Sequence, residues 1–62
     1  MSKKNKYLPK GTLVRLKFDH SIGVITGIIS GSANYALYSI EWLVNHEDNQ
    51  NFQQACFLEV IG

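Results

Sequence analysis

The chain has 62 residues, of which 45% are apolar and 18% are charged, and its formal net charge is +1. This length allows a single domain, and the composition is that of a globular chain, not a disordered one. One cysteine, Cys56, excludes an intramolecular disulfide. The basic start is followed by no apolar segment of a signal peptide, and no apolar run is long enough to span a membrane. We therefore expect a cytoplasmic protein without a membrane partner.

Charge is divided unevenly along the chain. All six basic residues lie within residues 1–17, and all five acidic residues come after them. We predict that residues 1–10 form a basic arm that leads into a turn at Pro9, and that residues 11–62 form the folded domain. Such asymmetry indicates a charged partner for the arm, whereas the alternative is a solvated tail that aids solubility. The candidate partner-binding residues of the arm are Lys3, Lys4, Lys6, Tyr7 and Lys10.

The first two predicted strands follow the arm. Residues 12–18 alternate with a period of two, which is typical of a strand with one buried face. The residues expected on that face are Val14, Leu16 and Phe18. After a turn at residues 19–21, the segment 22–29 is rich in β-branched residues and predicts a second strand. Its glycines, Gly23 and Gly27, favour bends that let a small sheet curl.

The third segment, residues 35–44, carries the clearest strand pattern. Aromatic and β-branched side chains alternate there with polar ones. The residues expected on its buried face are Tyr38, Ile40 and Trp42. A hairpin loop at residues 30–34 precedes this strand, and a polar turn at residues 45–51 follows it.

The C-terminal segment is harder to interpret. We predict a short strand at residues 52–54, a tight helical turn at 55–57 and a last strand at 58–61. One short helix over residues 51–58 is the alternative, although isolated helices of that length are marginal. Short strands at intervals of about ten residues, without an amphipathic helix, indicate a small all-β barrel. A two-sheet sandwich of the immunoglobulin type needs about 100 residues, and so the length excludes it.

The order of four short motifs resembles that of a known class of proteins. The motifs are Gly11-Thr12-Leu13-Val14-Arg15, Gly23-Val24-Ile25-Thr26-Gly27, Tyr38-Ser39-Ile40-Glu41-Trp42 and Leu58-Glu59-Val60-Ile61. Together they resemble small SH3-like barrel proteins encoded by tailed bacteriophages and, more distantly, KOW-type domains of ribosomal and transcription-elongation proteins. The resemblance covers about residues 11–61 and implies an SH3-like five-stranded barrel. For a phage-encoded protein, it also implies a place in the host cytoplasm or in the virion.

The sequence offers little for catalysis or for a cofactor. Nucleophilic catalysis needs a nucleophile, a base and an orienting group within reach of one another. Cys56 lies in an apolar segment, where we expect a buried core cysteine; a partner-facing thiol and a nucleophile are the alternatives. His20 and His46 lie in predicted loops beside carboxylates, without the spacing of a zinc site. We expect no enzyme, no metal, no cofactor and no small-molecule substrate.

Binding to a protein partner is the function that the sequence favours. The three central strands carry more apolar residues than one interior can bury, and contiguous exposed apolar surface commonly marks an interface. The residues expected on this partner-binding face are Leu13, Ile25, Ile29, Tyr35, Leu37 and Leu43. We therefore predict a protein–protein interaction module, such as a phage accessory or virion-associated protein, that binds another protein or assembles as a homo-oligomer.

Binding of nucleic acid through the arm is the alternative function. The six basic residues suffice for weak, salt-sensitive attachment to phosphates. The KOW-type resemblance also implies contact with RNA or with polymerase. However, residues 18–62 contain neither lysine nor arginine and carry all five carboxylates. The body of the protein therefore lacks the basic surface that such contacts need.

Overall fold

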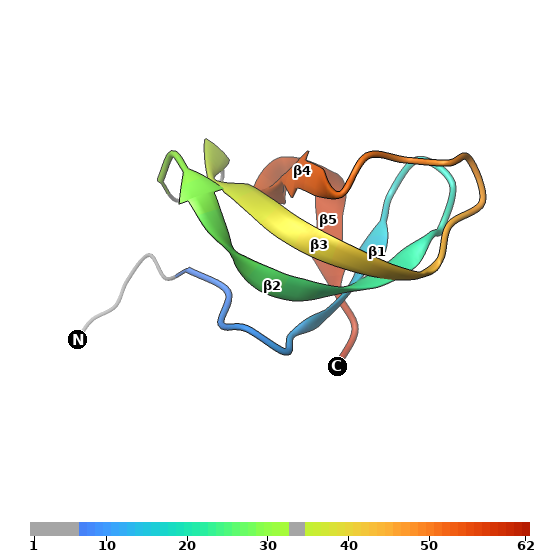
Figure 1. Ribbon diagram of the computed structural model, residues 1–62, viewed down its shortest axis with the longest axis horizontal. Coiled ribbons are helices and arrows are strands. Elements are labelled where there is room, and N and C mark those ends of the chain that lie inside the picture. The colour runs from blue at the N-terminus through green and yellow to red at the C-terminus, as the bar shows by residue number, and fades with distance from the viewer. Residues whose placement is uncertain (1–6, 33–34) are drawn as a thin grey trace.

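The computed structural model describes residues 7–32 and 35–62, and it shows an all-β chain (Figure 1). The strands are β1 (Leu13–Leu16), β2 (Ile22–Ser30), β3 (Leu37–Val44), β4 (Phe52–Gln54) and β5 (Leu58–Val60), and a 3-10 helix, η2 (Ala55–Phe57), joins β4 to β5. The predicted strands and helical turn are thereby confirmed, and the alternative of one helix over residues 51–58 is wrong. No helix in the described residues is long and apolar enough to cross a membrane.

The strands form one antiparallel sheet in the order β4-β3-β2-β1-β5. The sheet curves along β2 and β3 (Figure 1). However, β4 and β5 are its two edges, and in the described part of the chain no strand pairing joins them. The sheet is therefore not closed into the barrel that we expected. Both edge strands are only three residues long, and η2 turns the chain between them.

The core lies on the concave face of the sheet. Its buried hydrophobic residues are Val14, Leu16, Ile25, Ala36, Tyr38, Ile40 and Leu58. Trp42, which we predicted to be in the core, is half-buried and packs against this cluster, while its Nε1 donates a hydrogen bond to the carbonyl of Gln50 at 2.8 Å. The sequence pattern thus placed the buried faces of β1 and β3 correctly, since alternate residues of a strand point to opposite faces.

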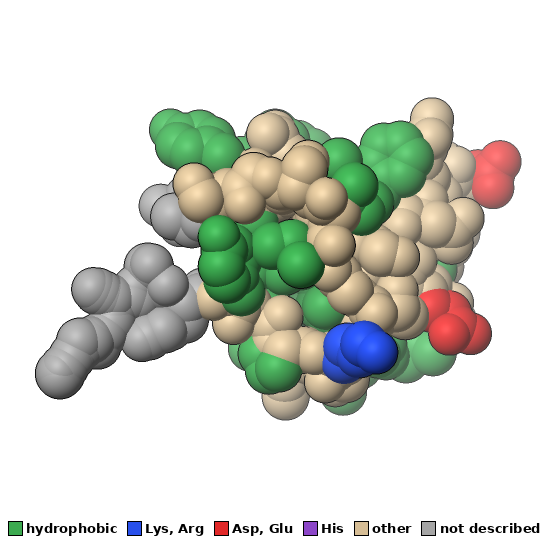
Figure 2. All heavy atoms as spheres, turned by 60° about the vertical axis from the view of Figure 1, so that its left-hand side comes forward, with side chains coloured by type: hydrophobic (Ala, Val, Ile, Leu, Met, Phe, Trp, Pro, Cys, Tyr) green, Lys and Arg blue, Asp and Glu red, His purple; other side chains and the backbone are tan. Residues whose placement is uncertain are grey.

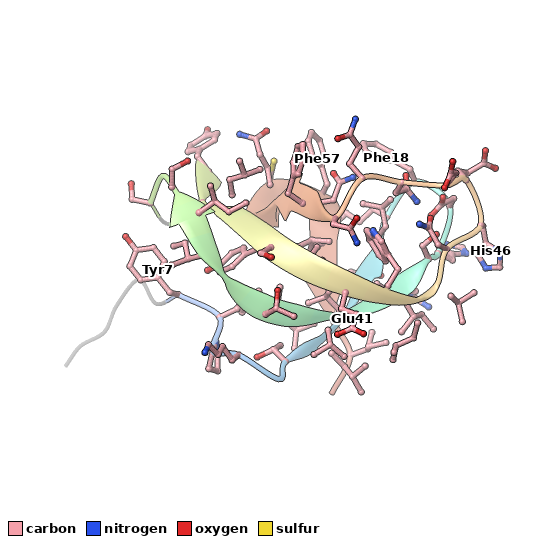
Figure 3. All side chains as sticks on the ribbon, in the orientation of Figure 1. Tyr7, Phe18, Glu41, His46 and Phe57 are labelled. Carbon is pink, nitrogen blue, oxygen red and sulfur yellow. The ribbon has the colours of Figure 1, made fainter. Side chains whose placement is uncertain are left out.

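The prediction that Phe18 is buried is wrong, because β1 ends at Leu16 and Phe18 is 70% exposed. Leu16 closes a tight loop: its N–H donates to the carbonyl of Ser21 at 2.8 Å, and its carbonyl accepts from the N–H of His20 at 2.9 Å. His20 turns the chain with a φ of 67°. Phe18 therefore lies in the loop, where its ring packs against that of Phe57 with centroids 4.9 Å apart and ring planes tilted by 43° (Figure 3).

The segment just before β1 is attached to the core. Leu8 packs against the buried cluster, and its N–H donates a hydrogen bond of 2.7 Å to the hydroxyl of Tyr38. Thr12 forms a turn with Pro9, whose carbonyl accepts from the Thr12 hydroxyl at 2.7 Å. The chain of the predicted arm is therefore in contact with the domain from Tyr7 onward, and Lys3, Lys4 and Lys6 lie outside the described residues.

Candidate protein-interaction surface

The predicted partner-binding residues do not form one face. Ile25 is 1% exposed and pairs with Ile40 in the core, so its assignment to a partner-binding face is wrong. The physical reason is the register of β2: Gly23 lies opposite Trp42 and Ile25 lies opposite Ile40, so both face the interior. Leu13 and Leu37 are half-buried, whereas Ile29, Tyr35 and Leu43 are exposed.

Four exposed apolar residues occur at the end of the β2–β3 hairpin. We define the hairpin-end patch as Tyr7, Ile28, Ile29 and Tyr35, which are between 46% and 71% exposed. Tyr7 reaches this end from the arm, and its hydroxyl lies 3.5 Å from the carbonyl of Gly31. Figure 2 shows hydrophobic side chains gathered at this end of the molecule. Tyr7 is one of the residues that we predicted to bind a partner through the arm, whereas Ile28, which follows a bulge in β2, was missed.

A tight approach of the backbone shapes the hairpin end. Gly31 has a φ of +84°, in the left-handed region that favours glycine. A Cβ at this position would lie 2.6 Å from the carbonyl oxygen of Tyr35. The N–H of Tyr35 donates to the carbonyl of Ser32 at 3.0 Å. This turn holds Tyr35 outside the sheet, where it is 71% exposed and available to a partner.

The basic residues that are described do not cluster on the sheet. Lys10 is exposed in the turn after Pro9, and Lys17 is exposed in the β1–β2 loop. Arg15 is neutralised by Glu59: its Nε and one Nη both donate to Oε1 of that residue, at 3.0 and 2.7 Å. This ion pair lowers the pKa of the Glu59 carboxyl. Among the described residues, no basic stripe comparable to a nucleic-acid footprint crosses the body.

A polar network joins the two loops at the opposite end of the molecule. Ser21 is fully buried, and its Oγ accepts hydrogen bonds from the N–H of His46 at 2.9 Å and from Nδ2 of Asn49 at 3.2 Å. Asn49 also donates to Oδ2 of Asp19 at 3.0 Å, and this bond is the main cause that lowers the pKa of Asp19. The network holds the β1–β2 loop against the β3–β4 loop.

The same network contains residue types found in hydrolases, but not their arrangement. Asp19 accepts a hydrogen bond from the backbone N–H of Ser21, and Ser21 accepts from the backbone N–H of His46. Both contacts use backbone groups where a nucleophilic mechanism needs the imidazole. The buried Ser21 hydroxyl is also closed to a substrate. The contacts around Ser21 are therefore those of a structural residue.

Cys56 is exposed, so the prediction of a buried core cysteine is wrong. It occupies the middle of η2, whose neighbouring residues Ala55 and Phe57 pack against the core. A 3-10 helix advances one residue per third of a turn, so the middle residue points away from the face that its neighbours bury. Within the part of the chain that the structure describes, no group of three or more His, Cys, Asp and Glu residues could hold a metal ion.

Comparisons with known proteins find no match: no family model, no curated protein and no solved structure matches the chain.

Proposed function

We propose that this protein is a non-catalytic interaction module of the SH3-like class, which docks an acidic protein surface through the hairpin-end patch and the basic arm. The open, curved five-stranded sheet with a 3-10 turn before its last strand supports the SH3-like part of this proposal. The resemblance to small phage proteins supports a role as an accessory or virion-associated protein.

One observation carries the proposal: the root of the basic arm lies on the exposed apolar end of the hairpin. Tyr7 contacts Gly31 there, and Lys3, Lys4 and Lys6 come shortly before Tyr7 in the sequence. The basic N-terminal segment of the sequence is therefore joined to the described chain at the patch. An apolar centre with a charged rim is the usual composition of a protein interface.

The charge of the opposite end favours an intermolecular partner for the arm. Asp19, Glu47 and Asp48 lie in the β1–β2 and β3–β4 loops, and Figure 3 shows His46 of the second loop and Tyr7 at opposite ends of the molecule. The acidic side chains in view in Figure 2 also lie away from the hairpin end. Exposed charges more than about 8 Å apart are largely screened from one another at physiological salt, so these loops are poorly placed to pair with charge near Tyr7. An acidic partner would then suit the basic arm, which would accelerate the partner's approach.

The proposal is tested by capture from an extract of the cells that make the protein, followed by titration of the captured partner. One variant removes the apolar centre (Ile29→Ser with Tyr35→Ser), and one removes the charge (Lys3, Lys4 and Lys6 to Gln). Each should weaken binding at least about tenfold, and added salt should weaken binding of the unchanged chain. Val60→Ser is the matched control, because Val60 is as exposed as Ile29, at 56% against 54%, but lies on β5.

Two outcomes would contradict this function. Equal recovery of the partner by both variants and by Val60→Ser would remove the hairpin-end patch as the docking surface. Fluorescence anisotropy with single-stranded DNA and RNA at low salt tests the other class of partner. Binding of nucleic acid that is lost with the three lysines but unchanged by Tyr35→Ser would replace the acidic protein by a polyanion, because phosphate attachment needs charge more than an apolar centre.

A further inference from the structure

The convex face of the sheet carries a second apolar surface, separate from the hairpin-end patch. Residues that pair across antiparallel strands place their side chains on the same face. Leu13 pairs with Val24, and Val24 pairs with Glu41. Leu13 also lies beside Ile61, whose backbone N–H donates a hydrogen bond of 2.9 Å to the Leu13 carbonyl. One row of side chains, across β1, β2, β3 and the segment that follows β5, is therefore Ile61, Leu13, Val24 and Glu41.

A second row lies next to the first. Arg15 pairs with Glu59 on one side and with Ile22 on the other, and Ile22 pairs with Val44. Val14 and Gly23 lie between the two rows and face the core. Because alternate residues of a strand point to opposite faces, the side chains of both rows point to the convex face. We define the outer-face patch by its aliphatic members in the two rows: Leu13, Ile22, Val24, Val44 and Ile61.

The composition of this patch is unusual for a face in contact with water. A solvated face of an antiparallel sheet normally carries polar residues. The other half of the same face does so: the hydroxyls of Thr26 and Ser39 lie 2.7 Å apart in a hydrogen bond. On the half that contains the patch, the two rows carry Glu41 and the Arg15–Glu59 ion pair, and Lys17 lies near enough to Glu59 to help lower the pKa of that carboxyl. Val44 is 42% exposed and Ile61 is 45% exposed, so this aliphatic surface is open to a partner.

We propose that the outer-face patch is a self-association surface, which packs against the same patch of a second copy of this chain. A small core is the first reason, since a chain of this size has a thin stability margin that a disulfide, a metal or a further interface can supplement. A disulfide within the chain is excluded by the single cysteine, and the described residues offer no metal cluster. A second copy of the chain would bury the aliphatic side chains of the patch, and such a copy is present wherever the chain is made.

The charges of the patch also suit a second copy. Two identical faces bring like charges together, so a face with a net charge would repel itself. Here Arg15 is already paired with Glu59 at 2.7 Å within the same chain. Glu41 lies at the end of its row, where it can stay in water, and Lys17 beside Glu59 supplies a charge of the opposite sign. A dimer of this kind buries the aliphatic side chains and leaves the ion pair at the rim.

The area of the outer-face patch limits the affinity of the dimer. Three strands and the segment after β5, about 4.8 Å apart and with about four residues of each, cover an area of roughly 250 Å². This is small beside the roughly 800 Å² that each partner contributes to a standard interface. We therefore expect a weak dimer with a dissociation constant on the order of 10–100 µM.

Sedimentation velocity from about 5 µM to 1 mM chain measures this equilibrium. The weight-average mass should rise with concentration from 7.0 kDa toward twice that value. Val24→Lys should hold the mass at 7.0 kDa, and its new ammonium faces Glu41 across the strands, so the sheet is retained. Ser30→Lys, on the same strand beyond the patch, should behave as the unchanged chain. Ile61→Lys near the C-terminus provides a second variant should Val24→Lys fail to fold, and it should give the same loss.

The position of the interface is tested separately by amide chemical shifts. In a dilution series, the signals that move with concentration should be those of the outer-face patch. A mass that stays at 7.0 kDa up to about 1 mM would overturn the inference, as would a dimer that Val24→Lys and Ile61→Lys leave intact. Shifts concentrated at Tyr7, Ile29 and Tyr35 would overturn it too and would assign self-association to the hairpin end. Because the two patches are distinct, none of the supporting outcomes depends on the proposed acidic partner.

Discussion

The hydroxyl of Tyr38 accepts a hydrogen bond of 2.7 Å from the backbone N–H of Leu8. Tyr38 is 1% exposed and central to β3, whereas Leu8 belongs to the segment that carries the arm. This single bond therefore ties the arm to the most buried aromatic ring of the core. It also explains how a buried tyrosine satisfies its polar atom, which is costly to leave without a partner.

Replacing Tyr38 by Phe should lower the free energy of unfolding by about 1–2 kcal/mol, because the N–H of Leu8 then loses its acceptor in a partly buried place. Urea unfolding followed by Trp42 fluorescence measures the change. Hydrogen exchange of the Leu8 amide should accelerate at the same time. Tyr35→Phe is the control and should change stability little, because Tyr35 is 71% exposed. An unchanged exchange rate at Leu8 in Tyr38→Phe would show that this bond does not hold the arm.

Ser21→Ala should lower the free energy of unfolding by about 1–3 kcal/mol, since the loss of Oγ removes the acceptor for the His46 N–H and for Asn49 Nδ2. Ser21 is the buried polar residue of the described chain, so water cannot replace this oxygen without a rearrangement of the loops. Ser32→Ala in the exposed β2–β3 loop serves as the control for loss of a hydroxyl. Equal stability of the two variants would refute a structural role for the polar network.

Gly23→Ala and Gly27→Ala test how closely β2 and β3 pack. A Cβ at Gly23 would lie 2.6 Å from Cγ2 of Ile40 and 2.9 Å from Cε3 of Trp42, so core side chains must move. We expect a loss of about 1–3 kcal/mol, the usual cost of overpacking. A Cβ at Gly27 meets no described atom within 4 Å, and Gly27→Ala should be neutral or slightly stabilising. Thermal unfolding compares the two variants directly, and a Gly23→Ala variant as stable as Gly27→Ala would contradict this packing.

The elements of the fold could be predicted from the sequence because three segments alternate with a period of two. The phase of that alternation was clear in β1 and β3, where polar residues mark the outer positions. It was unclear in β2, whose residues are almost all apolar or glycine, so Ile25 was placed on the wrong face. Only the pairing of Ile25 with Ile40, a long-range contact, determines that the Ile25 side chain points into the core.

The candidate surfaces were less predictable than the strands. Phe18 continues the alternation of β1 but lies beyond its end, because the tight loop that Leu16 closes depends on His20 with a positive φ. Cys56 lies in an apolar stretch, yet a single turn of η2 exposes it. The outer-face patch depends on neighbours from three strands and from the segment after β5, and the register between them cannot be predicted from any one segment alone.

Acid should destabilise the protein through two carboxyl groups. The pKa of Asp19 is lowered chiefly by the hydrogen bond from Asn49, and that of Glu59 chiefly by the hydrogen bonds from Arg15. In the unfolded chain both groups bind protons more readily, so their stabilisation is present above their ordinary pKa values. It is lost as the pH falls below about 4, through the lowered pKa values of the folded state. Glu59 is exposed and Asp19 is only half-buried, so each effect is expected to be small.

Urea unfolding between about pH 7 and pH 2 measures this loss, at about 1 µM chain to keep self-association from adding to stability. Asp19→Asn and Glu59→Gln should be less stable than the unchanged chain at neutral pH, and the difference should narrow as the pH falls, because protonation removes the same charge from the unchanged chain. Glu47→Gln, in the β3–β4 loop, should follow the unchanged chain throughout. A difference that stays constant down to about pH 2 would show that Asn49 and Arg15 do not favour the charged forms.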